Sequence, residues 1–243
     1  MPKYLIAERI FEIKNKYPYL EKLCRDYLYN GDEPADCTVE VDDKEIAAEN
    51  NGEIEGFPLP ILESVAVYRK IQAFLFEEDC FLIHCAVISY KGKAYAFTAK
   101  SGTGKTTHIR LWKKRFGDEV SVVNGDKPII RRQKNEDGSY SFIAYGTPWC
   151  GKEHYNTNRA VPLGGLFLLK RGEENRVELD KDGEAVPFLL GQMNYKNDVK
   201  YLGRMLDFLD SLITTIPVWR LYCNMDISAA ETAERAVSEK YEL

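Results

Sequence analysis

The chain has 243 residues, of which 44% are hydrophobic and 29% are charged, and its formal net charge is -5. This composition is that of a globular protein long enough to bury a substantial core. The acidic balance argues against duplex nucleic acid as a partner, because binding to phosphates requires a basic surface. No apolar run approaches the roughly 20 residues that cross a bilayer, so we expect no membrane partner.

The N-terminus and the cysteines indicate the compartment. The first residues mix acids and bases and lack the apolar region of a signal peptide, so we expect a protein that stays in the cytoplasm. The six cysteines show neither a CxxC pair nor the His spacing of a zinc site. We therefore expect reduced, buried thiols and no structural metal.

The chain divides into two parts by its pattern of turns. Residues 1–60 contain several turn signals and a short alternating strand over 38–41, and we interpret them as an N-terminal α+β layer or subdomain. Residues 61–243 form the second domain. Its expected elements, in chain order, are a helix over 61–77, strands over 81–89 and 94–98, a helix over 106–116, strands over 119–123, 129–132, 140–145 and 166–170, a helix over 199–215, a strand over 218–223 and a helix over 228–240.

Local signals refine these elements. Gly92 in the short connection after 81–89 favours an antiparallel hairpin, and the polar tip at 134–138 indicates a second one. Gly117 should end the helix over 106–116, and Ser228 with Glu231 should cap the last helix. The alternation of strands and helices predicts an α/β fold with a mixed sheet flanked by helices.

A glycine-rich loop carries the strongest functional signal. It fits the P-loop pattern, except that Ala99 replaces the first glycine, and it lies between a predicted strand and a predicted helix. Its amides and the start of the helix would hold phosphates, the lysine would bridge them, and the next hydroxyl would bind Mg²⁺. The nucleotide-binding residues are therefore expected to be Lys100, Ser101, Gly102, Thr103, Gly104, Lys105, Thr106 and Thr107.

A carboxylate is expected beside this loop. Asp126 follows the strand over 119–123 at about 20 residues from Lys105, where a nucleotide site needs a metal ligand. Asp126 could instead accept the proton of an attacking hydroxyl, or it could be an ordinary turn aspartate in an Asn-Gly-Asp loop.

The region 84–128 resembles the catalytic core shared by HPr kinase/phosphorylase and the ATP-dependent phosphoenolpyruvate carboxykinases. The resemblance rests on the loop over 101–107, on His84 before a buried strand, on the segment 124–127 in place of a paired-aspartate motif, and on the antiparallel hairpin. It extends to the short HPr-kinase-related proteins through the segments 107–112 and 146–149.

This resemblance implies a P-loop core of that type, with ATP and Mg²⁺ as cofactors. Asp126 matches the general base and metal partner of HPr kinase, and His84 matches the histidine that supports it. Gly125 departs from the family because it stands where the first aspartate should be, and Thr107 stands where HPr kinase has an acidic residue. The alternative interpretation of His84 is a buried, hydrogen-bonded core residue.

A turn-rich segment after residue 145 supplies further candidates. Lys152 is expected to stabilise the transferring phosphoryl group, unless it is an ordinary exposed lysine. Asn156 and Asn158 are candidate polar contacts to a substrate, while Trp149 could stack on a base or belong to the core. His108 is expected to be a surface or packing residue.

The sequence as a whole predicts an ATP-dependent kinase of the HPr kinase type. The catalytic residues would be Asp126, His84 and Lys152, the metal would be held by Thr106 and Asp126, and the acceptor would be a hydroxyl of a protein or peptide serine or of a small molecule. A carboxykinase-like enzyme and a non-catalytic nucleotide-binding module are the alternatives. Whether the chain forms a homo-oligomer stays open.

Overall fold

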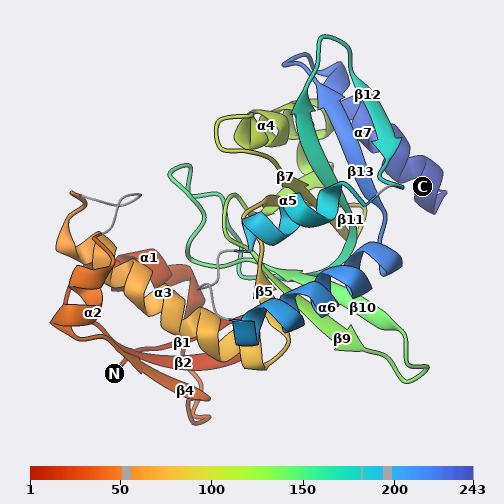
Figure 1. Ribbon diagram of the computed structural model, residues 1–243. Coiled ribbons are helices and arrows are strands. Elements are labelled where there is room, and N and C mark those ends of the chain that lie inside the picture. The colour runs from red at the N-terminus through yellow and green to blue at the C-terminus, as the bar shows by residue number, and fades with distance from the viewer. Residues whose placement is uncertain (51–55, 182, 194–198, 243) are drawn as a thin grey trace.

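The computed structural model describes residues 1–50, 56–181, 183–193 and 199–242. In this part of the chain, thirteen strands form one four-stranded and one nine-stranded sheet, and helices flank both (Figure 1). The protein is therefore a mixed α/β structure with a curled mixed sheet. None of the helices in these ranges combines the length and hydropathy that a membrane span requires.

The N-terminal layer is built on the smaller sheet, whose strand order is β3-β1-β2-β4. Its strands β1 and β2 form a hairpin, and the two turn residues, Ala7 and Glu8, both have positive φ. The elements are β1 (Lys3–Ile6), β2 (Arg9–Lys14), α1 (Tyr19–Cys24), a 3-10 turn η1 (Arg25–Tyr27), β3 (Leu28–Tyr29), β4 (Cys37–Glu40), α2 (Asp43–Ala48) and α3 (Leu59–Glu77).

Helix α3 connects the two sheets. Its buried face, which includes Val67 and Ile71, shares one hydrophobic cluster with Phe11 of the small sheet and with Leu82 and Ile129 of the large sheet. The predicted helix over 61–77 is confirmed. The division of the chain at residue 60 stays a prediction, and the cluster shows that residues on both sides of this position pack together.

The large sheet holds most of the remaining chain. Its strands are β5 (Cys80–Leu82), β6 (Ala86–Tyr90), β7 (Lys93–Thr98), β8 (Val120–Asn124), β9 (Ile129–Lys134), β10 (Tyr140–Tyr145), β11 (Ala160–Arg171), β12 (Arg176–Leu179) and β13 (Val218–Cys223). The helices are α4 (Lys105–Phe116), α5 (Ala185–Gln192), α6 (Val199–Thr215) and α7 (Ser228–Tyr241), with a 3-10 turn η2 (Gly117–Glu119).

The long strand β11 makes the large sheet curl. Its first residues pair antiparallel with β10, whereas Leu166 to Arg171 pair parallel with β13. Its other edge pairs parallel with β7, and β7 forms the predicted antiparallel hairpin with β6. The sheet is therefore mixed, with parallel strands at its centre.

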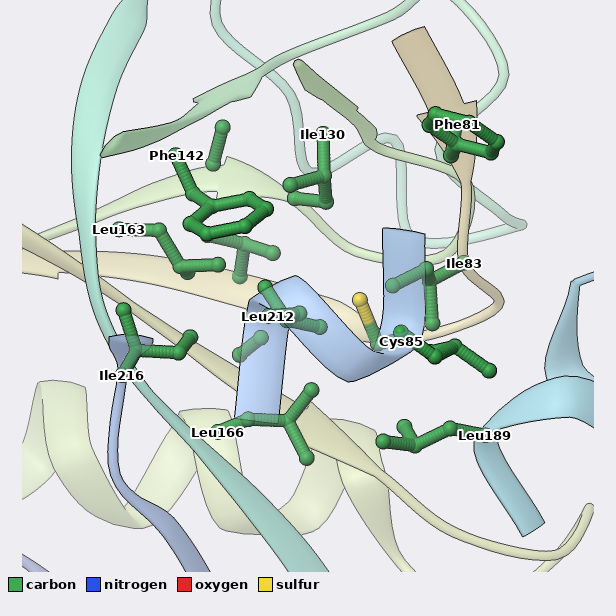
Figure 2. Close-up of a cluster of buried hydrophobic side chains, with 14 of the residues drawn as sticks. Phe81, Ile83, Cys85, Ile130, Phe142, Leu163, Leu166, Leu189, Leu212 and Ile216 are labelled. Carbon is green, nitrogen blue, oxygen red and sulfur yellow. The ribbon is translucent and has the colours of Figure 1, made fainter. Parts of the chain in front are cut away.

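Helices cover both faces of the parallel region (Figure 1). On one face, α5 and α6 bury Leu189 and Leu212 against Leu166 and Phe142, as Figure 2 shows. On the other face, α4 and α7 pack through residues such as Trp112. Alternate side chains of each strand enter the two cores, which fixes the register of the strands.

The ends of several strands lie together at one edge of the large sheet, next to the candidate site. Strands β7, β11 and β13 are parallel, so their carboxyl ends lie at the same edge. Strand β8 is antiparallel to β6, which is antiparallel to β7, so β8 also ends there and β6 begins there. Ligands of α/β sheets bind outside the carboxyl ends of the strands.

Two local predictions were wrong. The apolar run over 81–89 is not one strand, because the chain leaves β5 after Leu82 and starts β6 at Ala86. Both pieces are buried, so hydrophobicity gives no sign of the break. Ser228 does not cap α7: Asp226 accepts hydrogen bonds from the Ser228 amide (2.9 Å) and hydroxyl (2.6 Å).

Candidate functional site

A tight glycine-rich loop connects β7 to α4. Gly102 and Gly104 have φ of 74° and 122°, a region that favours glycine, and the Thr103 amide donates to the Lys100 carbonyl at 3.1 Å. The Arg171 guanidinium, at the end of β11, donates to the Gly102 carbonyl at 2.8 Å. The loop is thus held in shape by its own backbone and by a neighbouring strand.

The start of α4 provides donors for an anion. The first amides of a helix have no partner within the helix, and the helix dipole places positive charge there. Lys105 is the first helical residue, and Thr106 and Thr107 follow it. Lys100 and Ser101 are exposed on the loop, whereas Thr106 and Thr107 are partly buried. The predicted nucleotide-binding residues therefore lie together at one edge of the sheet.

Lys105, His84 and Asp126 form a chain of contacts beside the loop. The Lys105 Nζ lies 3.2 Å from the His84 Nε2. The His84 Nε2 also lies 3.0 Å from the Asp126 Oδ1. The backbone of His84 is fixed on both sides, because its amide donates to the Gln192 carbonyl and its carbonyl accepts from the Thr98 hydroxyl. The structure brings together three residues that are far apart in the sequence.

A single nitrogen of His84 faces both neighbours, which limits what it can do at one time. A neutral imidazole nitrogen either donates or accepts, so Nε2 can donate to Asp126 or accept from the Lys105 ammonium, but not both. An anion that draws the Lys105 ammonium away would free Nε2 to donate to the carboxylate. The contacts among Lys105, His84 and Asp126 can therefore rearrange when an anion binds.

Burial and neighbouring charges together shift the pKa values of Lys105 and Asp126. Burial lowers the pKa of the Lys105 ammonium, and the Asp126 carboxylate opposes this effect. Burial of Asp126 would raise its pKa, but the hydrogen bond from His84, together with the charges of Lys127 and Lys105, holds the pKa below its ordinary value. Asp126 is thus ionised at neutral pH.

Asn124, the last residue of β8, holds the backbone around Asp126. Its side-chain oxygen accepts from the amides of Asp126 and Lys127, both at 2.8 Å. Its amide group donates to the Thr147 carbonyl at 3.0 Å, and the Thr147 hydroxyl donates to the Lys127 carbonyl at 2.7 Å. Asn124 and Thr147 are fully buried, so this network positions the carboxylate.

Gly125 is required by close packing. A Cβ atom built on Gly125 would lie 2.8 Å from the Cys150 carbonyl and 3.3 Å from the Cβ of Tyr155. The Gly125 amide also donates to the Tyr155 carbonyl at 2.7 Å. The segment after β10 therefore occupies the space that a side chain, including a second aspartate, would need.

The same segment after β10 carries two further candidate residues, Lys152 and Trp149, of which one is exposed and the other is buried. Gly151 lies against Asp126, with 3.4 Å between the two Cβ positions, and the following Lys152 is exposed and has no hydrogen-bond or ion-pair partner within the described ranges. Trp149 is buried and donates to the Ser64 carbonyl at 3.1 Å, so it belongs to the core.

The two asparagines of this segment support the fold. Asn156 donates to the Thr147 carbonyl at 3.1 Å and to the Tyr27 hydroxyl at 3.3 Å. Asn158 donates to the Leu5 carbonyl at 3.2 Å and thus contacts the N-terminal layer. Their side chains are engaged by the protein in this structure.

A pocket that the sequence did not indicate opens on the other side of the loop. Its volume is about 460 Å³, and it lies between α4 and the ends of β11 and β13. Its wall contains residues of the loop and of three later elements: Gly102, Thr103, Gly104, Thr107, His108, Leu111, Leu169, Arg171, Gly172, Cys223, Asn224 and Met225. Only the parallel order of β7, β11 and β13 brings these residues together, and the sequence does not reveal that order.

Oxygen ligands for a metal ion are present in the candidate site. No cluster of three or more His, Cys, Asp or Glu side chains suited to a metal ion occurs in the part of the chain that the structure describes. Mg²⁺ is commonly held by one or two carboxylates together with substrate phosphates. The Thr106 hydroxyl and the Asp126 carboxylate are hard oxygen donors, so these residues fit Mg²⁺ that arrives with a nucleotide.

Matches to known proteins occur among solved structures. No protein-family model matches the chain, and no curated protein matches it. Among solved structures, the fold is similar to the Hpr(Ser) kinase/phosphatase from Coxiella burnetii, at 11% sequence identity and a TM-score of 0.35, over 66% of this chain and 94% of that chain. A TM-score this low carries no argument about the site or its activity.

Proposed function

We propose that the chain is an ATP-dependent kinase of the HPr kinase type, which transfers the γ-phosphoryl group to a hydroxyl of a protein or peptide serine or of a small molecule. The observation that carries this proposal is the contact chain from Lys105 through His84 to Asp126, directly at the helix that follows the glycine-rich loop. Phosphoryl transfer needs a cation on the phosphates and a carboxylate near the acceptor, and these contacts supply both.

The loop would bind the phosphates in this account. The free amides at the start of α4 donate to phosphate oxygens, and the Lys105 ammonium leaves His84 to bridge the β- and γ-phosphates. Partial burial lowers the pKa of Lys105 more than the Asp126 carboxylate raises it, so phosphate oxygens would add negative charge beside an ammonium that is incompletely compensated. This exchange favours a polyanion over a neutral ligand.

Thr106 and Asp126 would hold Mg²⁺ in the proposed complex. The metal ion supplies charge neutralisation on the phosphate oxygens when it is bound. The low pKa of Asp126 serves this role, because a metal ligand must be ionised at the working pH. Asn124 keeps the carboxylate oriented through the two backbone amides around it.

The transfer step requires a nucleophile and a proton acceptor. The acceptor hydroxyl oxygen forms the new bond to the γ-phosphorus, the bond to the bridging oxygen breaks and ADP leaves, and the hydroxyl proton passes to Asp126. His84 donates to Asp126 once Lys105 has moved, and Lys152, next to Gly151, stabilises the transferring group. Little base strength is needed, since the transition state for phosphoryl transfer is loose.

A non-catalytic nucleotide-binding module is the second candidate. Gly125 favours it, because the backbone of Cys150 leaves no room for the second carboxylate of the related kinases. With one carboxylate, the site would still bind a nucleotide and its metal ion but would hold that ion less firmly.

A transfer assay tests the kinase against both alternatives. The protein is incubated with γ-labelled ATP and Mg²⁺ in the presence of serine-containing peptides and polyols, and the label on the acceptor is measured. We expect Asp126→Asn to retain ATP binding within about threefold and to lose transfer by about 100-fold or more. Asp118→Asn, an exposed aspartate on η2, is the matched control.

The outcomes separate the candidates. Wild-type rates in Asp126→Asn would remove Asp126 as the base. ATP binding without transfer to any acceptor would support the non-catalytic module. Oxaloacetate-dependent turnover with ATP and Mn²⁺ would instead identify a carboxykinase.

A further inference from the structure

The phosphoryl acceptor has to reach Asp126 from outside the pocket. None of Lys105, His84 and Asp126 belongs to the pocket wall, whereas the acceptor hydroxyl must meet the γ-phosphate beside Asp126. The surface that it approaches is bordered by the end of β8 and by the turn over 151–154, because Gly151 lies against the Asp126 side chain. We call this surface the acceptor side.

Helix α4 presents different faces to the pocket and to the acceptor side. Thr107 and Leu111 belong to the pocket wall. Thr106, Arg110 and Lys113 follow one another at intervals of four and three residues, so they share another face of the helix. Arg110 and Lys113 are exposed on that face, about one and two turns beyond the proposed metal ligand. The helix therefore carries two cations in line with Thr106.

The segment after β10 lies along these two cations. The Arg110 guanidinium lies 3.8 Å from the Glu153 carboxylate, and the Lys113 Nζ lies 5.3 Å from the centre of the Tyr155 ring. The Tyr155 carbonyl accepts from the Gly125 amide at 2.7 Å, which anchors the same segment next to the proposed base. Both cations of α4 therefore belong to the acceptor side.

A third cation, Lys127, adjoins the carboxylate from the direction of α3. Its backbone is fixed, because its amide donates to the Asn124 side chain at 2.8 Å. Its ammonium lies 5.5 Å from the centre of the Tyr68 ring in α3. Burial raises the pKa of the Asp126 carboxyl, and the charge of Lys127 lowers it, next to the hydrogen bond from His84. The ammonium is therefore close enough to act on this carboxylate.

These cations are poorly compensated by the protein itself. Lys113, Lys127 and Lys152 form no ion pair within the described ranges. The contact between Arg110 and Glu153 is too long for a hydrogen bond, and such a pair at the surface contributes little. The chain as a whole carries a net charge of -5, so the positive charge here is a local feature. A positive surface beside a reactive centre attracts negatively charged ligands.

We propose that the phosphoryl acceptor is a serine or threonine in an acidic polypeptide segment, whose carboxylates are bound by Lys127 next to the hydroxyl and by Arg110 and Lys113 along α4. The inference rests on the proposed function and names the substrate class that this function leaves open. The transfer step is unchanged: the side-chain oxygen takes the γ-phosphoryl group from ATP, its proton passes to Asp126, and ADP leaves.

The spread of the cations favours a polypeptide over a small molecule. Lys127 contacts α3, which lies apart from α4 (Figure 1). Arg110 and Lys113 lie about 6 Å and 10 Å further along the axis of α4 than Thr106. A small hydroxy acid with its hydroxyl at Asp126 would reach one of these cations. An extended peptide advances about 3.3 Å per residue, so acidic side chains two to four residues away from the hydroxyl would reach the others.

Matched peptides test the preference for negative charge. Each peptide has one serine in the same frame, with aspartate, asparagine or lysine at the neighbouring positions, and glycerate is added as a small anionic acceptor. Each acceptor is incubated with γ-labelled ATP and Mg²⁺, and kcat and KM are measured separately. We expect the wild type to have a KM about tenfold lower for the aspartate peptide than for the asparagine peptide, at similar kcat.

Substitutions assign this preference to the named cations. Lys127→Met removes the charge and keeps the length of the side chain, and the preference for aspartate over asparagine should fall below about threefold. Lys127→Arg should restore it. The double variant Arg110→Gln with Lys113→Gln changes exposed residues only and should reduce the preference by a similar factor. Lys240→Met, an exposed lysine of α7, is the matched control and should keep the full preference.

The variants are first shown to be folded by circular dichroism and to bind ATP as the wild type does by calorimetry. Equal use of the three peptides, transfer to glycerate alone, or a full preference in both Lys127→Met and the double variant would overturn the acidic acceptor and leave the kinase standing. If the folded wild type binds ATP and labels no acceptor, the proposed kinase falls and this inference falls with it.

Discussion

The two sides of the glycine-rich loop are built differently. On one side, Asp126 is held by buried backbone hydrogen bonds through Asn124, and a glycine is packed against a carbonyl oxygen. On the other side, the pocket has a partly exposed apolar wall, and His108 in that wall has a buried ring nitrogen with no hydrogen-bond partner among the described residues. The backbone around Asp126 is thus fixed by contacts within the protein, whereas the wall of the pocket is partly open to solvent.

This difference predicts where substitutions have their effects. Substitution of residues packed around Asp126 should change the free energy of unfolding, because these residues contact other parts of the protein. Groups at the rim of the pocket should affect ligand affinity and leave the fold unchanged.

The largest effect on stability should come from Gly125→Ala. The new methyl group would lie 2.8 Å from the Cys150 carbonyl, so the segment after β10 must shift, at a cost of about 3 kcal/mol in the free energy of unfolding. Gly203→Ala is the matched control, since nothing lies within 4 Å of its Cβ position in α6, and there the change should stabilise by about 0.5–1 kcal/mol. Urea unfolding measures both, and a cost below about 1 kcal/mol for Gly125→Ala would contradict the close packing.

Protonation of His108 at low pH should have a smaller effect on the free energy of unfolding. The pKa of His108 in the folded protein, about 3, lies below its ordinary value of 6.5, so the unfolded chain binds the proton first as the pH falls. The stabilising contribution is therefore complete above pH 6.5 and is lost as the pH falls from there towards about 3. At pH 5 the loss should be about 2 kcal/mol.

The variant His108→Gln isolates this contribution, because glutamine does not titrate. The free energy of unfolding is measured for both proteins from pH 8 to pH 4, and the difference between the two curves removes the carboxylates that titrate in common. A difference that does not change with pH would show that the ring is not buried in its neutral form.

The smallest effect on stability is expected at the rim of the pocket. Met225→Ala should change the free energy of unfolding by less than about 0.5 kcal/mol, because the side chain is 80% exposed. A stability loss above about 1 kcal/mol would show instead that Met225 is part of the core, which would weaken the contrast between the two sides.

Local signals explain how much of the structure the sequence could predict. The hairpin between β6 and β7 turns at Lys91 and Gly92, both with positive φ, and the glycine made it recognisable. The hairpin between β1 and β2 turns at Ala7 and Glu8, whose types do not favour positive φ, so it was missed. Helix α4 and its end at Gly117 followed from periodicity and a glycine.

The features that the sequence did not predict depend on contacts between distant segments of the chain. The break between β5 and β6 has no polar residue to mark it other than His84, and the reason for Gly125 lies in Cys150 and Tyr155. The pocket depends on the parallel pairing of β7, β11 and β13, which no local pattern reveals. The sequence thus predicted the candidate phosphate-binding and chemical residues but not the neighbouring pocket.

Calorimetric titration of ATP with Mg²⁺ into the wild type, Lys105→Ala and Lys114→Ala measures whether the loop and Lys105 bind the phosphates of a nucleotide. Lys114 is an exposed lysine near the other end of α4 and serves as the control. We expect binding by the wild type and Lys114→Ala, and a loss of at least about 100-fold in Lys105→Ala, since a partly buried ammonium on a polyphosphate is worth several kcal/mol. Equal affinity of folded Lys105→Ala and wild type, or no binding by the folded wild type at millimolar ATP, would contradict this expectation.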